Sequence, residues 1–128
     1  MIEMYIVEDE TALRSFCASS AVAYDEDVMA YSASFCGGVI GYCLFVMSEK
    51  VLTILAEGVS DEYGAELCDG LTRAALSYAA TRGVLRAEFA AGVSAEVWQK
   101  LQSFGYTQKI MPDIDKFLTG CKNCSKKQ

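Results

Sequence analysis

The run VIGYCLFVM, from Val39 to Met47, limits most strongly how this chain can fold. It carries no charge and is too short to cross a bilayer, which takes about 20 residues. An apolar run of this length is typical of a central β-strand covered on both faces. Gly37-Gly38, just before it, signals a two-residue hairpin. The chain therefore needs a sheet with packed layers on both sides.

Strand-like and helix-like patterns alternate around this run. Strands are predicted over residues 4–7, 28–36, 51–56, 84–90, 106–111 and 114–118, and helices over residues 11–23, 64–82 and 94–104. The alternating polarity of 28–36 predicts a half-buried strand. The predicted helix caps are Asp9 or Thr11, Ser94, Gly83 and Gly105. The order β-α-β-β-β-α-β-α-β-β predicts an α/β protein of the α+β type, with a mixed, mostly antiparallel sheet and helices on both faces.

The chain length predicts one domain, over residues 1–120, followed by a polar, basic tail over residues 121–128. The start MIEMYIVEDE has neither the basic residues nor the long apolar stretch of a secretory signal. We therefore expect a cytoplasmic protein without a membrane anchor. In that compartment its six cysteines are expected to be reduced thiols.

Charge is divided unevenly along the sequence. The net charge is -6, with -11 in residues 1–70 and +5 in residues 71–128. An acidic chain of this kind argues against nucleic-acid binding, which needs a basic face. The acidic half leaves room for a cationic partner, although solvated surface charges explain the asymmetry equally well.

The stretch VSDEYGAELCDGL, residues 59–71, links a predicted strand to the longest predicted helix. A glycine-bearing turn at a helix start often binds phosphate, but this one contains four acids and no Lys or Arg. A carboxylate about 4 Å from a bound phosphate oxygen would weaken phosphate binding by about 4 kcal/mol through charge repulsion. The helix N-terminus strengthens phosphate binding by only about 0.3–1 kcal/mol per charge. Two interpretations stay open: an anion cradle whose acids point away, or an ordinary helix start capped by Ser60, Asp61 and Glu62.

From about Met4 to about Leu118 the chain resembles the GNAT superfamily of acyl-CoA-dependent N-acetyltransferases. The segments that carry the resemblance are GVIGYCLF, TILAEGVSDEYGAEL, LTRAALSYAATRGVLRAEF and AEVWQKLQSFGY, in this order and spacing. The resemblance implies a V-shaped opening between the fourth and fifth strands, which holds the pantetheine arm of acetyl-CoA or another acyl-CoA. The acceptor would be a small-molecule or peptide amine.

The resemblance also implies site residues. The cofactor pyrophosphate would meet backbone groups of Val59, Gly64, Ala65, Glu66 and Leu67. Glu57, near the end of the fourth strand, is the candidate base, because a carboxylate at an apolar cleft can have a raised pKa. Glu88 on the fifth strand is a weaker alternative. An outward-facing acid at a strand end is the structural alternative for Glu57.

Several positions depart from the family pattern. The pyrophosphate loop has no basic residue, is about one residue short and has Glu66 at a glycine position. The leaving-group tyrosine position is Leu101, and Tyr106 holds a position that the family fills with core phenylalanine. These departures support a second hypothesis: a non-catalytic GNAT-fold protein with a degenerate CoA site, which acts by weak ligand binding, dimerisation or partner binding.

Two further features bear on assembly and metals. One helix is expected between the first two strands, where the family commonly has two. Either the acceptor site is open, or a second subunit completes it in a homodimer. Cys121 and Cys124 have the spacing of metal ligands, but the chain has no histidine and no second close cysteine pair. No metal site is predicted.

Overall fold

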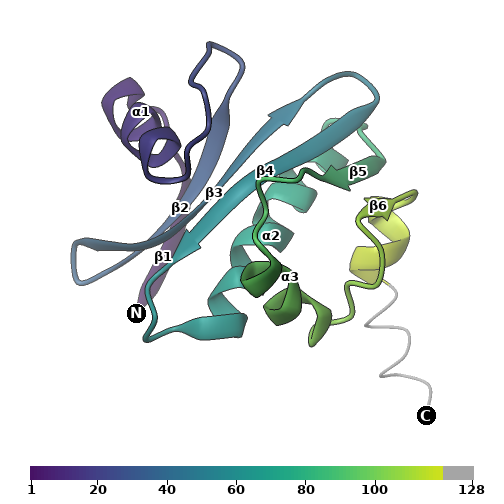
Figure 1. Ribbon diagram of the computed structural model, residues 1–128. Coiled ribbons are helices and arrows are strands. Elements are labelled where there is room, and N and C mark those ends of the chain that lie inside the picture. Colours follow the sequence, from purple (N-terminus) through teal and green to yellow (C-terminus); the bar gives the residue numbers. More distant parts are fainter. Residues whose placement is uncertain (120–128) are drawn as a thin grey trace.

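A six-stranded sheet forms the centre of the computed structural model, which describes residues 1–119 (Figure 1). In chain order the elements are β1 (Ile2–Ile6), α1 (Glu10–Ser19), β2 (Met29–Phe35), β3 (Gly38–Met47), β4 (Val51–Val59), α2 (Gly64–Thr81), β5 (Arg86–Phe89), α3 (Ala95–Gln102) and β6 (Ile110–Met111). The strands lie side by side in sequence order, and only β4 and β5 run parallel. The predicted fold class, a mixed and mostly antiparallel sheet, is confirmed.

Helices cover both faces of this sheet. In Figure 1 α1 lies on one face, and α2 and α3 lie on the other. The larger core packs beneath α2 and includes Cys43, Phe45 and Ile54, whereas Leu44 belongs to a smaller core beneath α1. The central strand β3 is therefore covered on both faces, as its apolar run predicts. β2 was predicted to be half-buried, which is wrong, because Ser32 is only 1% exposed beside the fully buried Ala30.

The helix caps follow the sequence signals in most places. Asp9 accepts a hydrogen bond from the Ala12 N–H at 3.3 Å, and Ser94 accepts one from the Val97 N–H at 3.2 Å. Gly83 and Gly105 have φ values of 84° and 96°, which glycine adopts at little cost. These short-range signals place the ends of α1, α2 and α3 to within a few residues.

The β2–β3 hairpin differs by one residue from its prediction. Phe35 pairs with Gly38, so the two-residue loop is Cys36-Gly37 and not Gly37-Gly38. Both loop residues have positive φ, 53° and 83°, as a type I′ turn requires. The Cys36 thiol is exposed on this turn, whereas the other described cysteines, Cys17, Cys43 and Cys68, are buried free thiols.

The last predicted strand, residues 114–118, is wrong: residues 114–119 are helical. Asp113 caps this helix by accepting from the Lys116 N–H at 3.1 Å. The apolar residues Ile114, Phe117 and Leu118 have helical i, i+3, i+4 spacing, and Ile114 is fully buried. The tail, with Cys121 and Cys124, lies outside the described residues. No helix within residues 1–119 combines the length and apolar character needed to span a membrane.

Candidate active site

The strands β4 and β5 separate after a short parallel pairing. Val51–Ile54 pairs with Arg86–Phe89, and the last contact is a 2.9 Å hydrogen bond from the Ala90 N–H to the Ile54 carbonyl. Beyond this point β4 continues to Val59 without pairing to β5. A side chain at Gly92 would place its Cβ 2.5 Å from the Leu55 carbonyl oxygen. β5 ends here while β4 continues, and the V-shaped opening implied by the resemblance stays a prediction.

A β-bulge sets the direction of the side chains in this part of β4. Phe45 pairs with Ile54 and Leu44 with Ala56, so Leu55 is an extra residue on β4. Ile54 belongs to the core beneath α2 and Ala56 to the core beneath α1. The extra residue reverses the alternation, and Glu57, paired with Cys43, faces α2. In an unbulged strand it would face α1.

Glu57 is buried, with 9% of its surface exposed, so the outward-facing alternative is wrong. Its Oε1 has no hydrogen-bond partner within the described residues. Burial raises the pKa of Glu57 to about 8; hydrogen bonds from Thr72 and Cys43 oppose the rise, and the Asp69 carboxylate adds to it. The carboxyl group therefore holds a proton in most molecules at neutral pH.

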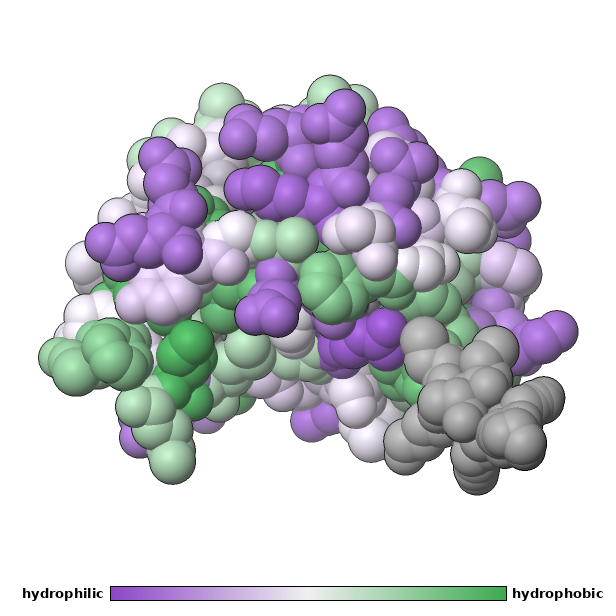
Figure 2. Space-filling view, turned by 90° about the horizontal axis from the view of Figure 1, so that it is seen from below, coloured by the Kyte–Doolittle hydropathy of each residue, from purple (hydrophilic) through white to green (hydrophobic). Residues whose placement is uncertain are grey.

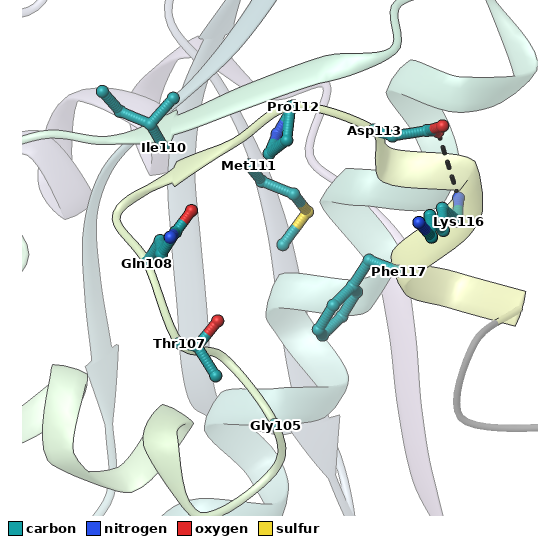
Figure 3. Close-up of a pocket in the computed structure, with 9 residues that line it drawn as sticks. All are labelled: Gly105, Thr107, Gln108, Ile110, Met111, Pro112, Asp113, Lys116 and Phe117. Carbon is teal, nitrogen blue, oxygen red and sulfur yellow. Dashed lines mark hydrogen bonds between the residues drawn. The ribbon is translucent and has the colours of Figure 1, made fainter. Parts of the chain in front are cut away.

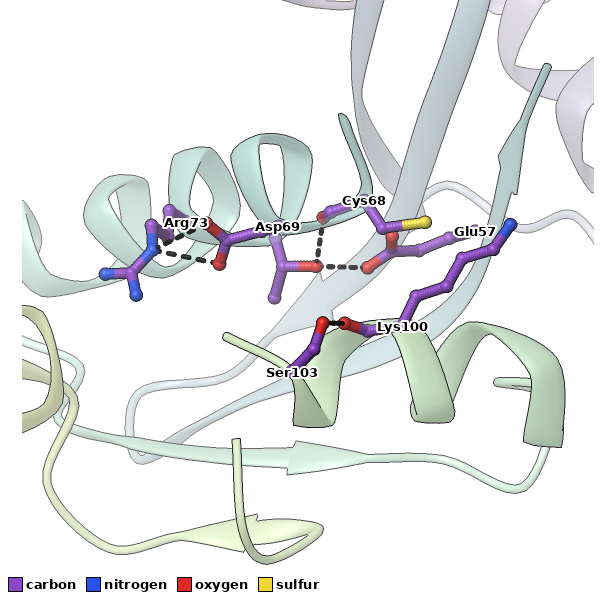
Figure 4. Close-up of polar contacts among 7 residues, drawn as sticks. Glu57, Cys68, Asp69, Arg73, Lys100 and Ser103 are labelled. Carbon is purple, nitrogen blue, oxygen red and sulfur yellow. Dashed lines mark hydrogen bonds and ion pairs between the residues drawn. The ribbon is translucent and has the colours of Figure 1, made fainter. Parts of the chain in front are cut away.

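The hydrogen bonds of Thr72 agree with a protonated Glu57. The Thr72 hydroxyl oxygen forms a hydrogen bond with Glu57 Oε2 and lies 2.8 Å from the Cys68 carbonyl oxygen. Figure 4 shows Glu57 and Cys68, with these contacts as dashed lines. A hydroxyl has one proton and can donate to only one of these oxygens. If Thr72 donates to Cys68, a neutral Glu57 donates to Thr72, and both contacts are satisfied. Sequence reasoning missed Thr72, which no local motif identifies.

Two thiols flank the same carboxyl group. Burial raises the pKa of the Cys43 thiol, and the Glu57 charge raises it further. The pKa of Cys68 is raised to about 11, mainly by burial, although the Lys100 ammonium of α3 opposes the rise. Both thiols therefore stay neutral, and Glu57 is the group of this cluster that titrates nearest neutral pH.

The N-terminus of α2 has no side-chain cap. The helix starts at Gly64, and Tyr63, in the N-cap position, makes no side-chain hydrogen bond. Within the described residues no side chain accepts from the N–H groups of Gly64, Ala65 or Glu66. The alternative in which Ser60, Asp61 and Glu62 cap this helix is wrong. Gly64 has a φ of 60°, and a Cβ there would meet no atom within 4 Å.

The acids of this turn lie at the surface. Asp61, Glu62 and Glu66 are exposed. Asp69, one turn further along α2, is partly buried and forms an ion pair with Arg73 at 2.9 Å. Exposure lets water screen these charges, so their repulsion of an anion at the helix start is far smaller than that of a buried carboxylate.

The other candidate residues lie in less reactive settings. Glu88 is on β5 and forms a surface ion pair with Arg86 at 3.2 Å, with 40% of its side chain exposed. Leu101, at the leaving-group position, is fully buried. Tyr106 is a core residue, as its position predicts, and packs against Phe117. Its hydroxyl makes no hydrogen bond within the described residues, and burial and the nearby Asp69 raise its pKa.

A groove lies on the opposite face, between α1 and the ends of β3 and β4. Phe16 of α1 stacks on Tyr42 at 4.4 Å, and the Tyr42 hydroxyl lies 2.6 Å from the Ser20 hydroxyl. The Tyr42 ring covers Gly58, where a Cβ would come within 2.6 Å of it. The groove is lined by Gly58 and Val59 of β4 and by Ser60 just after it. It adjoins a second hollow, which shares Phe16 and Val39 and is also lined by Glu8 and Asp9.

A separate pocket of about 200 Å³ lies beside β6 (Figure 3). It is lined by Gly105, Thr107, Gln108, Ile110, Met111, Pro112, Asp113, Lys116 and Phe117. None of these residues belongs to β4, β5 or the start of α2. Within residues 1–119 no His, Cys, Asp and Glu side chains are grouped as metal ligands.

Solved structures similar to this chain include several acetyltransferases. One is the ribosomal-protein-S18-alanine N-acetyltransferase from Escherichia coli, with 16% identity, a TM-score of 0.62 and coverage of 84% of this chain and 78% of that one. An aminoglycoside N-acetyltransferase, AAC(6')-Iy, in complex with CoA, has 14% identity, a TM-score of 0.61 and coverage of 84% and 92%. A GNAT family acetyltransferase from Elizabethkingia anophelis with acetyl-CoA bound has 12% identity, a TM-score of 0.58 and coverage of 83% and 76%.

At the sequence level no family model and no curated protein matches the chain. The sequence identity to these structures is below 25%, so the structural likeness establishes the fold and nothing further. The chain has the GNAT acetyltransferase fold.

Proposed function

We propose that this protein is an acyl-CoA-dependent N-acyltransferase that moves an acetyl or another acyl group to an amine. The observation that carries the proposal is the uncapped start of α2, which directly follows the part of β4 that has left β5. An uncapped helix start offers backbone N–H donors and a positive dipole end to an anion. This combination, on this fold, supports the use of an acyl-CoA.

The residues present fit a pyrophosphate group through their backbone. Among residues 1–119 no side chain accepts from the N–H groups of Gly64, Ala65 and Glu66, and Gly64 leaves open space where a side chain would stand. Val59 and Leu67 border this turn from β4 and α2. When bound, acyl-CoA would supply an activated thioester. The protein's part is to hold and align it beside the amine, which can account for much of the barrier reduction.

Glu57 is the proposed proton acceptor. Its pKa of about 8 leaves a minor ionised fraction at neutral pH that can take a proton from an ammonium group. The carboxyl group is buried on the α2 side, so the proton would reach it through water at the edge of β4 that β5 has left. Thr72 would hold the carboxyl group in place, and we assign Thr72 a positioning role. Glu88 has no comparable environment and is not proposed.

The groove beneath α1 is the proposed acceptor site. It is lined by Gly58, next to Glu57 in the chain, and the adjoining hollow is lined by Glu8 and Asp9. Carboxylates there favour a cationic amine, and the Phe16–Tyr42 stack offers an apolar wall to the remainder of a small molecule or peptide.

Calorimetric titration with acetyl-CoA, with dephosphorylated pantetheine as the control ligand, tests cofactor use. Micromolar binding that needs the pyrophosphate is the expected result. An amine panel, with release of free CoA thiol as the readout, then tests transfer. Absence of binding at millimolar acetyl-CoA would refute the proposal.

A non-catalytic protein on the same fold is the second candidate. Leu101 at the leaving-group position and the limited exposure of Glu57 favour it. Binding of acetyl-CoA without turnover of any amine, unchanged by Glu57→Gln, would select this function.

A further inference from the structure

The strand β1 forms an open edge of the sheet. Within residues 1–119 it pairs with β2 alone and is the first of the six strands in sheet order. Of the usual edge protections it carries one charged side chain, Glu3, and no lysine, no proline and no bulge. Its side chains are unusually exposed for apolar residues, with 41% for Ile2, 39% for Met4 and 44% for Tyr5.

The ladder with β2 fixes which backbone groups face this open edge. The Val7 N–H donates to the Ala30 carbonyl at 2.8 Å, so the main chain of Val7 points toward β2. In an antiparallel pair this direction alternates from residue to residue. The N–H and C=O groups of Ile2, Met4 and Ile6 therefore point away from β2, toward the open edge.

These outward groups match a second copy of the same strand. If a two-fold axis passes beside Met4, antiparallel pairing sets Met4 against Met4 and Ile2 against Ile6 of the other copy. All three outward-facing residues then pair with one another, and every outward N–H finds a C=O. Glu3 lies opposite Tyr5 of the other copy, so no like charges face each other. A strand whose edge pairs with itself in this way fits an isologous contact.

Apolar surface beside β1 supports the same contact. On the α2 face Ile2 and Met4 border a hollow with Tyr63 and Leu67, and a Cβ at Gly70 would lie 2.7 Å from the end of Met4. In Figure 2, which views the molecule from below, hydrophobic residues gather at the left, the side on which Figure 1 places the N-terminus and the β2–β3 hairpin. Neighbouring exposed residues are Phe35 and Val39.

We propose that the protein forms a homodimer by antiparallel pairing of β1 with β1 of a second copy, which joins the two sheets into one. The contact buries one strand edge and a few apolar side chains on each side. This is a small interface, and it predicts a reversible dimer of micromolar affinity. The inference does not depend on the proposed acyltransfer.

Sedimentation of the full chain across micromolar to submillimolar concentrations tests the dimer. The wild type should shift from monomer to dimer. Met4→Pro removes an N–H that the isolated sheet does not use, and edge strands accept proline; it should be monomeric throughout. Met4→Leu, the matched control, should still dimerise. Ile2→Lys should also give a monomer, whereas Leu85→Lys, at an equally exposed apolar site away from β1, should not.

Circular dichroism and thermal unfolding of each variant show whether it is folded. If Met4→Pro is unfolded, the oligomeric states of Ile2→Lys and Leu85→Lys, compared with each other, test the dimer instead. A wild type that stays monomeric at all concentrations, or a dimer that survives in the folded β1 variants, would overturn the proposal.

Discussion

Replacement of Glu57 by glutamine should stabilise the fold, by an amount that grows with pH. The pKa of Glu57 is raised from 4.5 to about 8 by burial. Between these two values the unfolded chain has lost the proton that the folded chain keeps, so the wild type loses stability as the pH rises through this window. Below this pH window the folded and the unfolded chain both hold the proton, and above it the loss of stability is complete. Glutamine cannot ionise, so the variant lacks this loss.

The magnitude follows from the width of the window. Within the window each pH unit lowers the wild-type free energy of unfolding by about 1.4 kcal/mol. The loss is up to about 5 kcal/mol over the full window and up to about 3 kcal/mol over the part below neutral pH. For a domain of this size 1 kcal/mol corresponds to about 3–4 °C in Tm. The amide keeps the shape of the neutral carboxyl group and its contact with Thr72. The gain at neutral pH should therefore be about 10 °C at most.

Urea unfolding of both proteins across the pH window measures this difference. The two free energies of unfolding should agree near pH 4.5 and diverge until about pH 8. Glu88→Gln is the matched control, because that side chain is 40% exposed in a surface ion pair and should change stability by less than about 1 kcal/mol at any pH. Parallel curves for the wild type and Glu57→Gln would show that Glu57 ionises normally, and the reasoning about its burial would fail.

Three more outcomes are expected. If Glu57 is the base, kcat/KM should rise with pH to a plateau above about pH 8, and Glu57→Gln should lower it about 10²–10⁴-fold; a flat profile would contradict the role. Glu66→Gln should tighten acetyl-CoA binding about two- to fivefold at low salt and less at high salt, measured by calorimetry, because one exposed charge beside the helix start is removed. Gly92→Ala should cost about 1–3 kcal/mol in urea unfolding, because its Cβ would meet the Leu55 carbonyl oxygen; an unchanged midpoint would show that the loop adapts freely.

Local signals in the sequence predicted most of the fold correctly. Asp9, Ser94, Gly83 and Gly105 act through neighbours a few residues away, so their effect does not depend on the remainder of the chain. The apolar run of β3 requires cover on both faces wherever it lies. The helix at 114–119 was missed because residues 114–118 were predicted as a strand, although Asp113 just before them is a good helix cap.

The candidate site was harder to predict, because one bulge decides its geometry. Sequence position alone gives Glu57 at a strand end, which is usually an exposed place. The extra residue at Leu55 reverses the faces of β4 and turns the carboxyl group under α2. Thr72 lies 15 residues away in the sequence and meets Glu57 only after α2 has packed on the sheet. Burial of an acid is therefore a property of the assembled layers.

The short pairing between β4 and β5 divides the molecule into two parts, one built from contacts close in sequence and one from contacts far apart in sequence. The strands β2, β3 and β4 are joined by short turns and can form from local hairpins, whereas β1 joins them across α1 and β5 must wait for α2 to cross the sheet. Four residue pairs then join the two parts. We expect the four pairs at this seam to open more easily than the longer ladders that join β2, β3 and β4. A ligand that touches both β4 and β5 would close it and slow amide exchange in β5.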